Sequence, residues 1–131
     1  MITEAAVALD RNRMIRYDVS SGNLSVTDLG RVASHYYIRS ESVATFHELL
    51  EQVGRYPSDA DLLHVLCHAG EFENVRVRGD ELTEVDELRK RDCPLEVKAP
   101  VEEFSGKTCV LLQAYISRST RVKSFTLISD T

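Results

Sequence analysis

Apolar residues recur at helical spacing through the second part of the chain. The first stripe starts near Ser40 and ends at Gly54 and Pro57. Its apolar side chains fall on one helical face, at intervals of three, three, one and three: Val43, Phe46, Leu49, Leu50 and Val53. Later stripes around Leu62, Val85 and Val110 follow the same rule. The pattern predicts helices that each pack through one face.

Polar residues mark where these helices begin and end. Ser58 and Asp61 have the spacing of a capping box, with Asp in place of the usual Glu. Gly70 is placed to end the helix that follows. The stretch "GDELTEVDELRKRD" predicts another helix, in which acidic residues lead and basic residues trail, as the helix macrodipole favours. Its apolar residues recur every third position, so we expect a surface helix with one buried edge.

Residues 1–38 follow a different pattern, in which a hairpin separates two helices. "TEAAVALDR" is predicted to be helical, "RMIRYDV" and "NLSV" to flank the turn "SSG", and "DLGRVASHYYI" to form the next helix. Thr27 and Asp28 can cap that helix through their side-chain oxygens. This order predicts the C-terminal part of a winged-helix domain over 1–38. Residues 39–131 are then the N-terminal part of a helical domain whose last apolar run is cut at Thr131, so the fold class is mainly α.

The segment "SGKTCVLLQAYISR" contains the Gly-Lys-Thr that closes a phosphate-binding P-loop. That motif needs a glycine five positions before Gly106, where this chain has Val101. The preceding run "CPLEVKAPVEE" holds two prolines and does not read as the strand that leads into such a loop. Because the following residues are apolar at helical spacing, we expect Ser105 and Gly106 to open a packed helix that ends near Arg118.

The composition is that of one ordinary soluble domain. The chain has 131 residues, 43% hydrophobic and 28% charged, and no apolar run approaches the ~20 residues that a membrane span needs. A net charge of −5 argues against a broad basic surface for nucleic acid, but not against local basic patches. The three cysteines, Cys67, Cys93 and Cys109, are widely spaced and no signal peptide precedes them. We therefore expect free thiols, an intracellular location and no membrane partner.

Three residues that could bind zinc share one predicted helical face. His64, Cys67 and His68 lie three and four residues apart, so a helix would bring them near one ion, as a zinc-dependent enzyme would require. A closed structural site needs a fourth ligand, and no second pair of ligands is close in sequence. We therefore expect no metal and a core thiol at Cys67. We also expect no catalytic residues, since Ser34 and His35 are helical neighbours that point apart.

Two local groups of basic residues could contact nucleic-acid phosphates. They are Arg11, Arg13 and Arg16 at the predicted wing, and Arg118, Arg121 and Lys123 between the last two predicted helices. Each phosphate contact would mainly add salt-dependent affinity rather than sequence recognition. Ordinary charge at helix ends is the alternative explanation for both groups.

Three stretches of the sequence, in the right order, resemble the large Ski2-like superfamily-two helicases. "LSVTDLGRVASHYYIRSESVATFHELL" is similar to the junction between their winged helix and their Sec63-homology domain. "AGEFENVRVRGDELTEVDEL" resembles their Glu-Phe pair, Arg-rich segment and acidic helix, and "VLLQAYISR" resembles their Leu-Leu-Gln-Ala helix. The resemblance implies that ATP and Mg²⁺ bind two upstream RecA-like domains, none of whose motifs occur here. It therefore implies a non-catalytic segment that holds no cofactor itself.

The resemblance also implies a role and partners. In these helicases the winged helix braces the RecA-like domains, and the helical bundle closes one side of the strand channel, with a ratchet helix expected beyond "SFTLISDT". The implied partners are the RecA-like domains of the same parent chain, single-stranded RNA or DNA, and other subunits of a helicase complex, in the nucleus or the cytoplasm. A stand-alone helical protein-interaction adaptor is the alternative. Either function predicts an exposed apolar patch near Val110, Leu111 and Ile128.

Overall fold

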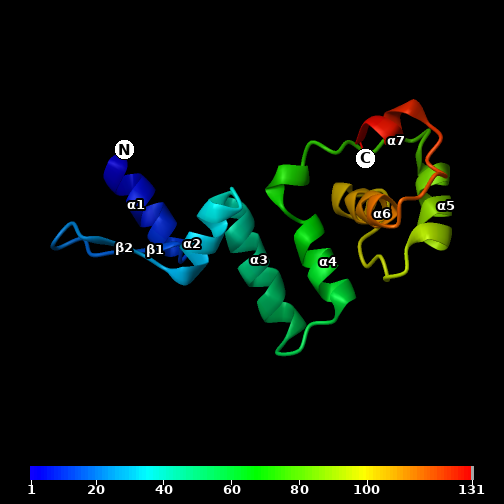
Figure 1. Ribbon diagram of the computed structural model, residues 1–131. Helices are drawn as coiled ribbons and strands as arrows, with labels where there is room; N and C mark the ends of the chain where they lie inside the picture. Colours follow the sequence, from blue (N-terminus) through cyan, green and yellow to red (C-terminus); the bar gives the residue numbers. More distant parts are fainter. Residues whose placement is uncertain (131) are drawn as a thin grey trace.

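Helices account for most of the chain, as the apolar spacing predicts (Figure 1). A computed structural model describes residues 1–130, apart from the side chain of Phe125. Over that range the only sheet is one antiparallel hairpin. The elements in order are α1 (Ile2–Arg11), β1 (Ile15–Tyr17), β2 (Leu24–Val26), α2 (Asp28–His35), α3 (Ser40–Val53), α4 (Asp59–Cys67), the 3₁₀ helix η1 (Gly70–Phe72), α5 (Leu82–Asp92), α6 (Phe104–Ile116) and α7 (Phe125–Asp130).

The predicted hairpin and the cap of the following helix are both confirmed. Ile15 pairs with Val26, and the Thr27 hydroxyl accepts the Gly30 amide at 3.0 Å, so α2 begins at the predicted place. Gly30 is required because a Cβ there would lie 1.8 Å from the carbonyl oxygen of Met14. The backbone just before β1 is therefore packed directly against the first turn of α2.

Two helices end earlier than predicted, each because of a contact outside the helix or a special backbone turn. The helix predicted over "DLGRVASHYYI" ends at His35, where Tyr37 adopts a left-handed backbone (φ 57°) and the Ile38 amide bonds back to Ala33. The helix predicted to run to Gly70 ends at Cys67. Gly70 instead begins η1, and its amide donates to the Ser42 hydroxyl of α3 at 3.0 Å.

Helix α6 is the centre of the second part of the chain. It contacts α4, α5 and η1, and Figure 1 shows it between α4 and α5. Its first turn packs so closely on the preceding loop that a Cβ at Gly106 would lie 1.9 Å from the Pro100 carbonyl oxygen. The Gly-Lys-Thr sequence thus lies at the start of a packed helix, which confirms the prediction that Ser105 and Gly106 open such a helix.

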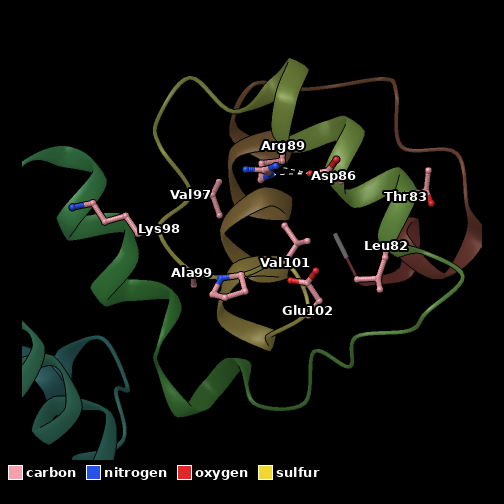
Figure 2. A pocket seen from close by; sticks show the side chains of 10 residues that line it. Leu82, Thr83, Asp86, Arg89, Val97, Lys98, Ala99, Val101 and Glu102 are labelled. Atoms are coloured by element: carbon pink, nitrogen blue, oxygen red, sulfur yellow. Dashed lines mark hydrogen bonds and ion pairs between the residues drawn. The ribbon is translucent and has the colours of Figure 1, made fainter.

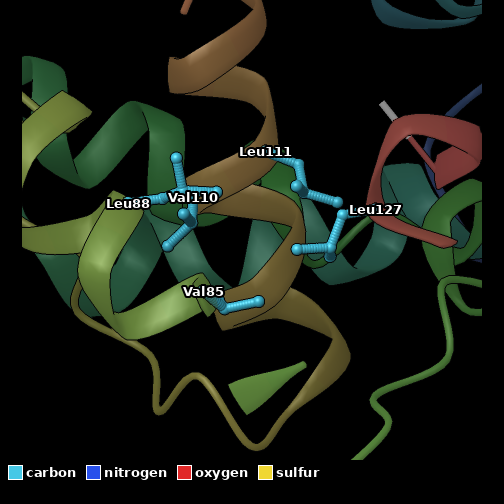
Figure 3. Packing of buried hydrophobic residues seen from close by; sticks show 5 residues of the cluster. All are labelled: Val85, Leu88, Val110, Leu111 and Leu127. Carbon is cyan, nitrogen blue, oxygen red and sulfur yellow. The ribbon is translucent and has the colours of Figure 1, made fainter. Parts of the chain in front are cut away.

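The hydrophobic core joins α5, α6 and α7. Figure 3 shows its five buried side chains converging from these three helices: Val85, Leu88, Val110, Leu111 and Leu127. The Val85 and Leu88 positions confirm the predicted buried edge of α5. The prediction of an exposed patch near Val110, Leu111 and Ile128 is wrong for the first two, which are core residues. Of the three, only Ile128 is exposed. Helix α7 covers the place where that patch was expected.

Candidate functional site

Lys107, the lysine of the Gly-Lys-Thr sequence, is fully buried in the first turn of α6. Its exposed fraction is 0%, and its Nζ donates to Glu81 Oε2 and Asp130 Oδ2, each at 2.8 Å, and to the Arg76 carbonyl oxygen at 2.6 Å. A buried ammonium is costly unless it is paired and hydrogen-bonded, and here all three of its N–H groups have an acceptor. This lysine therefore joins α6 to the start of α5 and to α7, and it is not available to a phosphate.

Arg78 and Lys107 share two carboxylate partners, so that two cations and two carboxylates form a ring. Arg78 Nη1 donates to Glu81 Oε1 at 2.8 Å and to Asp130 Oδ2 at 3.2 Å, the same two side chains that Lys107 binds. Burial acts to raise the pKa of the Glu81 carboxyl, but hydrogen bonds from Lys107, Thr126 and Arg78 outweigh burial and lower it to about 2. Glu81 therefore stays ionised at neutral pH inside a charge-balanced cluster. We call these four residues, Arg78, Glu81, Lys107 and Asp130, the ion ring.

Helix α7 is held at three points along its length. At its start, Glu84 Oε1 of α5 accepts the Lys123 and Ser124 amides at 2.6 and 3.2 Å, a cap supplied from another helix. In its middle Leu127 is buried in the core, and at its end Asp130 joins the ion ring. The direction of this short helix is therefore fixed by α5 and α6.

The Gln in the Leu-Leu-Gln-Ala stretch fixes the loop that precedes α6. The Gln113 side chain accepts the Leu95 amide at 2.9 Å and donates to the Leu95 carbonyl at 3.1 Å, as a neighbouring strand would. Gln113 is buried, and both the oxygen and the NH₂ group of its side-chain amide have the hydrogen-bond partners that a buried polar group needs. Leu111 lies in the core and Ala114 is buried against its neighbours.

The Glu of the "AGEFEN" stretch joins η1 to the start of α3. Glu71 accepts hydrogen bonds from the Arg39 amide at 2.7 Å and from the Ser42 hydroxyl at 2.5 Å. It thus acts as an N-terminal cap of α3 that is supplied from a distant part of the chain. Burial acts to raise the Glu71 pKa, but these hydrogen bonds outweigh burial and hold the pKa below its ordinary value. Two of the stretches that carry the family resemblance thus supply polar contacts between elements: Glu71, Arg78 and Glu81 in one, Gln113 in the other.

The basic residues between α6 and α7 lie on an exposed loop beside the acidic helix α5. Arg118 follows the end of α6 with a left-handed backbone (φ 51°). Arg121 Nη1 lies 3.2 Å from Asp92 Oδ1, and Lys123 shares a shallow cavity with Glu84 and Glu87. Carboxylates of α5 thus already offset part of the positive charge of this loop. The other group, Arg11, Arg13 and Arg16, is exposed around the turn between α1 and β1 and on β1 itself.

The three residues that could bind zinc do not converge on a common point. Cys67 is buried and hydrogen-bonded to the Cys109 thiol across α4 and α6, which confirms the predicted core thiol. His68 Nδ1 lies 2.8 Å from the His64 carbonyl oxygen, and the two imidazoles stack edge to face. Among residues 1–130, no group of three or more His, Cys, Asp or Glu side chains has the arrangement to hold a metal ion.

A cleft of about 670 Å³ lies between α5 and the loop 97–102 (Figure 2). Three of its charged side chains, Asp86, Arg89 and Lys98, already have partners. Asp86 pairs with Arg89 at 2.6 Å, as the dashed lines in Figure 2 show, while Lys98 points away from the cleft and pairs with Asp61 of α4. The cleft has the open shape of a groove between packed elements and brings no nucleophile and base together.

Comparison with known proteins agrees with this architecture. The family model "Sec63 Brl domain" matches residues 26–131. The chain is 42% identical to the DExH-box ATP-dependent RNA helicase DExH14 of Arabidopsis thaliana and to the Activating signal cointegrator 1 complex subunit 3 of Bos taurus. It is 41% identical to the U5 small nuclear ribonucleoprotein 200 kDa helicase of Homo sapiens.

These alignments extend over nearly all of the present sequence. Each covers 99% of this chain but only 6% of the relative, so the chain spans a small part of the length of these curated relatives. Within residues 1–130, no helix is long and apolar enough to cross a membrane. With one family model over most of its length and 41–42% identity to three helicase-type proteins, the chain belongs to the Sec63 Brl domain family, in the form found in Ski2-like helicases.

Proposed function

We propose that the chain acts as a non-catalytic accessory region of a large ATP-dependent helicase, where it braces the RecA-like core and the strand channel during unwinding. The observation that carries the proposal is the alignment of 99% of the chain with 6% of a protein named as an ATP-dependent RNA helicase. The burial of Lys107 agrees with it, because the one lysine in a P-loop-like context serves the fold. ATP and Mg²⁺ would be bound by other domains of the same parent chain.

The contacts between elements support a bracing role. Glu71 joins η1 to α3, Gln113 joins the loop 93–103 to α6, and the ion ring joins α5, α6 and α7. Each of these contacts connects segments distant in sequence, so the docked helices are held to one another at several points. A brace needs this property, because it must pass force between the domains on either side without deforming.

Contact with a single strand of RNA or DNA is the second part of the proposal. Arg118, Arg121 and Lys123 would supply it, since they are exposed on one loop, with Arg13 and Arg16 as a separate weaker group. Fluorescence anisotropy with labelled single-stranded RNA and DNA tests this part. Replacing the three loop residues by Ala should weaken binding. It should also make the slope of log K against log salt concentration shallower, by the amount expected for the loss of up to about three phosphate contacts. An unchanged affinity and salt slope would remove the loop from the strand path.

A domain exchange tests the bracing role itself. Residues 1–131 would replace the aligned segment of DExH14, and RNA-duplex unwinding and ATP hydrolysis would be measured on the purified chimaera. We expect ATP-dependent unwinding to be retained, and to be lost when the segment is deleted. The control is an unrelated helical domain of similar length in the same place, which should restore the length of the chain but not the unwinding.

The contradicting result is a chimaera that folds and hydrolyses ATP but unwinds no better than the one with the unrelated domain. Circular dichroism and a thermal melt of each protein separate this outcome from misfolding. The proposal also places the chain inside the cell, with the subunits of a helicase complex as its partners. A stand-alone helical adaptor would instead retain its binding partners in isolation and give no rescue in the chimaera.

A further inference from the structure

We infer that Lys107, Glu81 and Arg78 form a preformed receptor for the Asp130 carboxylate, which sets the direction of α7 and lets this helix undock while the rest of the bundle stays folded. The inference rests on the proposed function only for its consequence in unwinding. The receptor itself is an arrangement of side chains within residues 76–130 and can be tested without any helicase activity.

The receptor has internal bonds that do not involve Asp130. Lys107 Nζ has Glu81 at 2.8 Å and the Arg76 carbonyl at 2.6 Å, and Arg78 has Glu81 at 2.8 Å. No buried charge would be left without a partner, which is the outcome that makes the breaking of most buried pairs so costly. The excess positive charge would fall on Arg78, whose side chain is 38% exposed and can be solvated.

Helix α7 depends on this docking for its structure. It has six residues, far below the ~12–15 at which an isolated helix becomes even marginally stable in water. Its contacts include the cap from Glu84, the burial of Leu127, the hydroxyl of Thr126 on Glu81, and Asp130 in the ion ring. Loss of the last contact should therefore raise the population of the undocked state more than it disturbs α5 or α6.

The position of Asp130 explains why it sets direction. Glu84 and Leu127 fix the start and the middle of α7, and Asp130 fixes its end against α6. Two cations bind the same oxygen, Oδ2, at 2.8 and 3.2 Å, so the carboxylate is held from two sides. Asp130 is therefore a positioning residue, and any segment that follows α7 would be aimed by it.

Hydrogen exchange of the whole chain tests the receptor, with a graded set of variants. Asp130→Asn keeps the shape and removes the charge; Asp130→Glu keeps the charge; Asp86→Asn is the matched control, because it removes a carboxylate from exposed ion pairs with Arg89 and Lys90. We expect Asp130→Asn to speed exchange in residues 125–130 about 10- to 100-fold, the effect of a lost charge-assisted hydrogen bond. The exchange of α5 and α6 should change less than about threefold.

The conservative variants complete the test. Asp130→Glu should return exchange in 125–130 to within about threefold of the original, and Asp86→Asn should leave it unchanged. The inference is overturned if Asp130→Asn leaves residues 125–130 as protected as before. It is equally overturned if protection is lost evenly over α5, α6 and α7, because undocking would then be the same event as unfolding of the bundle.

The functional consequence is read separately, in the DExH14 chimaera. There Asp130→Asn should lower the duplex unwound per ATP hydrolysed, while ATP hydrolysis itself stays unchanged. If hydrogen exchange changes as expected but the original chimaera does not unwind, the receptor stands and the proposed function fails. If the chimaera unwinds but exchange in 125–130 does not respond to Asp130→Asn, the proposed function stands and the receptor fails.

Discussion

Residues 1–39 and residues 40–130 are held together by different physical means. In the first region the only buried residues are Ala6, Gly30 and Ala33. Large apolar side chains are exposed on α1, β2 and α2. The second region closes a core between α5, α6 and α7 and adds the ion ring beside it. The first is shaped by turns and caps, whereas the second is stabilised by its own interior.

Exposed apolar side chains occur in both regions of the chain. Leu24 and Val26 on β2, Leu29 and Val32 on α2, and Tyr37 after it are all more than a third exposed. Large apolar side chains are exposed in residues 40–130 as well, among them Tyr115 and Ile116, so exposure does not separate the two regions. The difference is that residues 1–39 have almost no interior of their own, whereas residues 40–130 have a core. The following variants test this difference in pairs.

The largest effect is expected at the ion ring. Lys107→Met should destabilise the chain by about 3–5 kcal/mol, because it removes the central cation and leaves buried Glu81 with less compensation. The measurement is urea unfolding followed by circular dichroism. Lys90→Met is the matched control, since Lys90 is 64% exposed in an intrahelical pair and should change stability by less than about 0.5 kcal/mol. Equal effects of the two variants would contradict a structural role for Lys107.

The next effect compares one leucine from each region. Leu88→Ala should cost about 2–5 kcal/mol, because Leu88 is 2% exposed in the core and its loss leaves a cavity. Leu24→Ala should change the free energy of unfolding by less than about 0.5 kcal/mol, because Leu24 on β2 is 58% exposed. Both values come from the same urea titration. A large cost at Leu24 would show that the hairpin is packed in solution within this chain.

The third comparison uses two glycines that allow close backbone contact. An added Cβ at Gly106 or at Gly30 would meet a carbonyl oxygen at 1.9 or 1.8 Å, so Ala must displace the backbone in both cases. We expect Gly106→Ala to lower the stability of the bundle by about 1–3 kcal/mol. Gly30→Ala should instead loosen the hairpin against α2, seen as faster hydrogen exchange in residues 14–30. An identical shift of the main unfolding transition by both variants would contradict the separation of the regions.

The smallest effect is a dependence of stability on acid. The pKa of Glu81 is lowered to about 2 in the folded chain, so its contribution is complete above its ordinary pKa near 4.5 and is lost as the pH falls from there toward 2. We expect the free energy of unfolding to decline below pH 4.5, and to decline less steeply in Glu81→Gln. The measurement is urea unfolding at a series of pH values. Parallel pH profiles of the two proteins would show that Glu81 is not the group responsible.

Local structure could be predicted well from the sequence where neighbouring residues determine it. The capping box of Ser58 and Asp61 forms with both of its hydrogen bonds, and Gly54 ends α3 with a left-handed backbone (φ 93°). The ends of α2 and α4 were predicted too late. In α4 the reason is a bond from the Gly70 amide to Ser42 of α3, a contact 28 residues away that no local pattern contains.

The ion ring was missed because its members are far apart in sequence. Lys107 lies 26 residues from Glu81 and 23 from Asp130, and charged residues are normally assigned to the surface. One signal was present. Lys107 shares its helical face with Val110, Leu111 and Ala114, at spacings of three, four and seven, so the apolar stripe itself places a lysine in the core. A buried lysine then requires carboxylate partners, although spacing alone does not identify them.

Residues 40–130 form one preorganised unit that holds α7, while residues 1–39 have almost no interior of their own. Hydrogen exchange of the unmodified chain tests it most directly. We expect the slowest exchange in α5 and α6, intermediate protection of residues 125–130, and markedly faster exchange in residues 1–39. Equal protection of residues 1–39 and α6, or exchange in residues 125–130 as fast as in residues 1–39, would contradict the account.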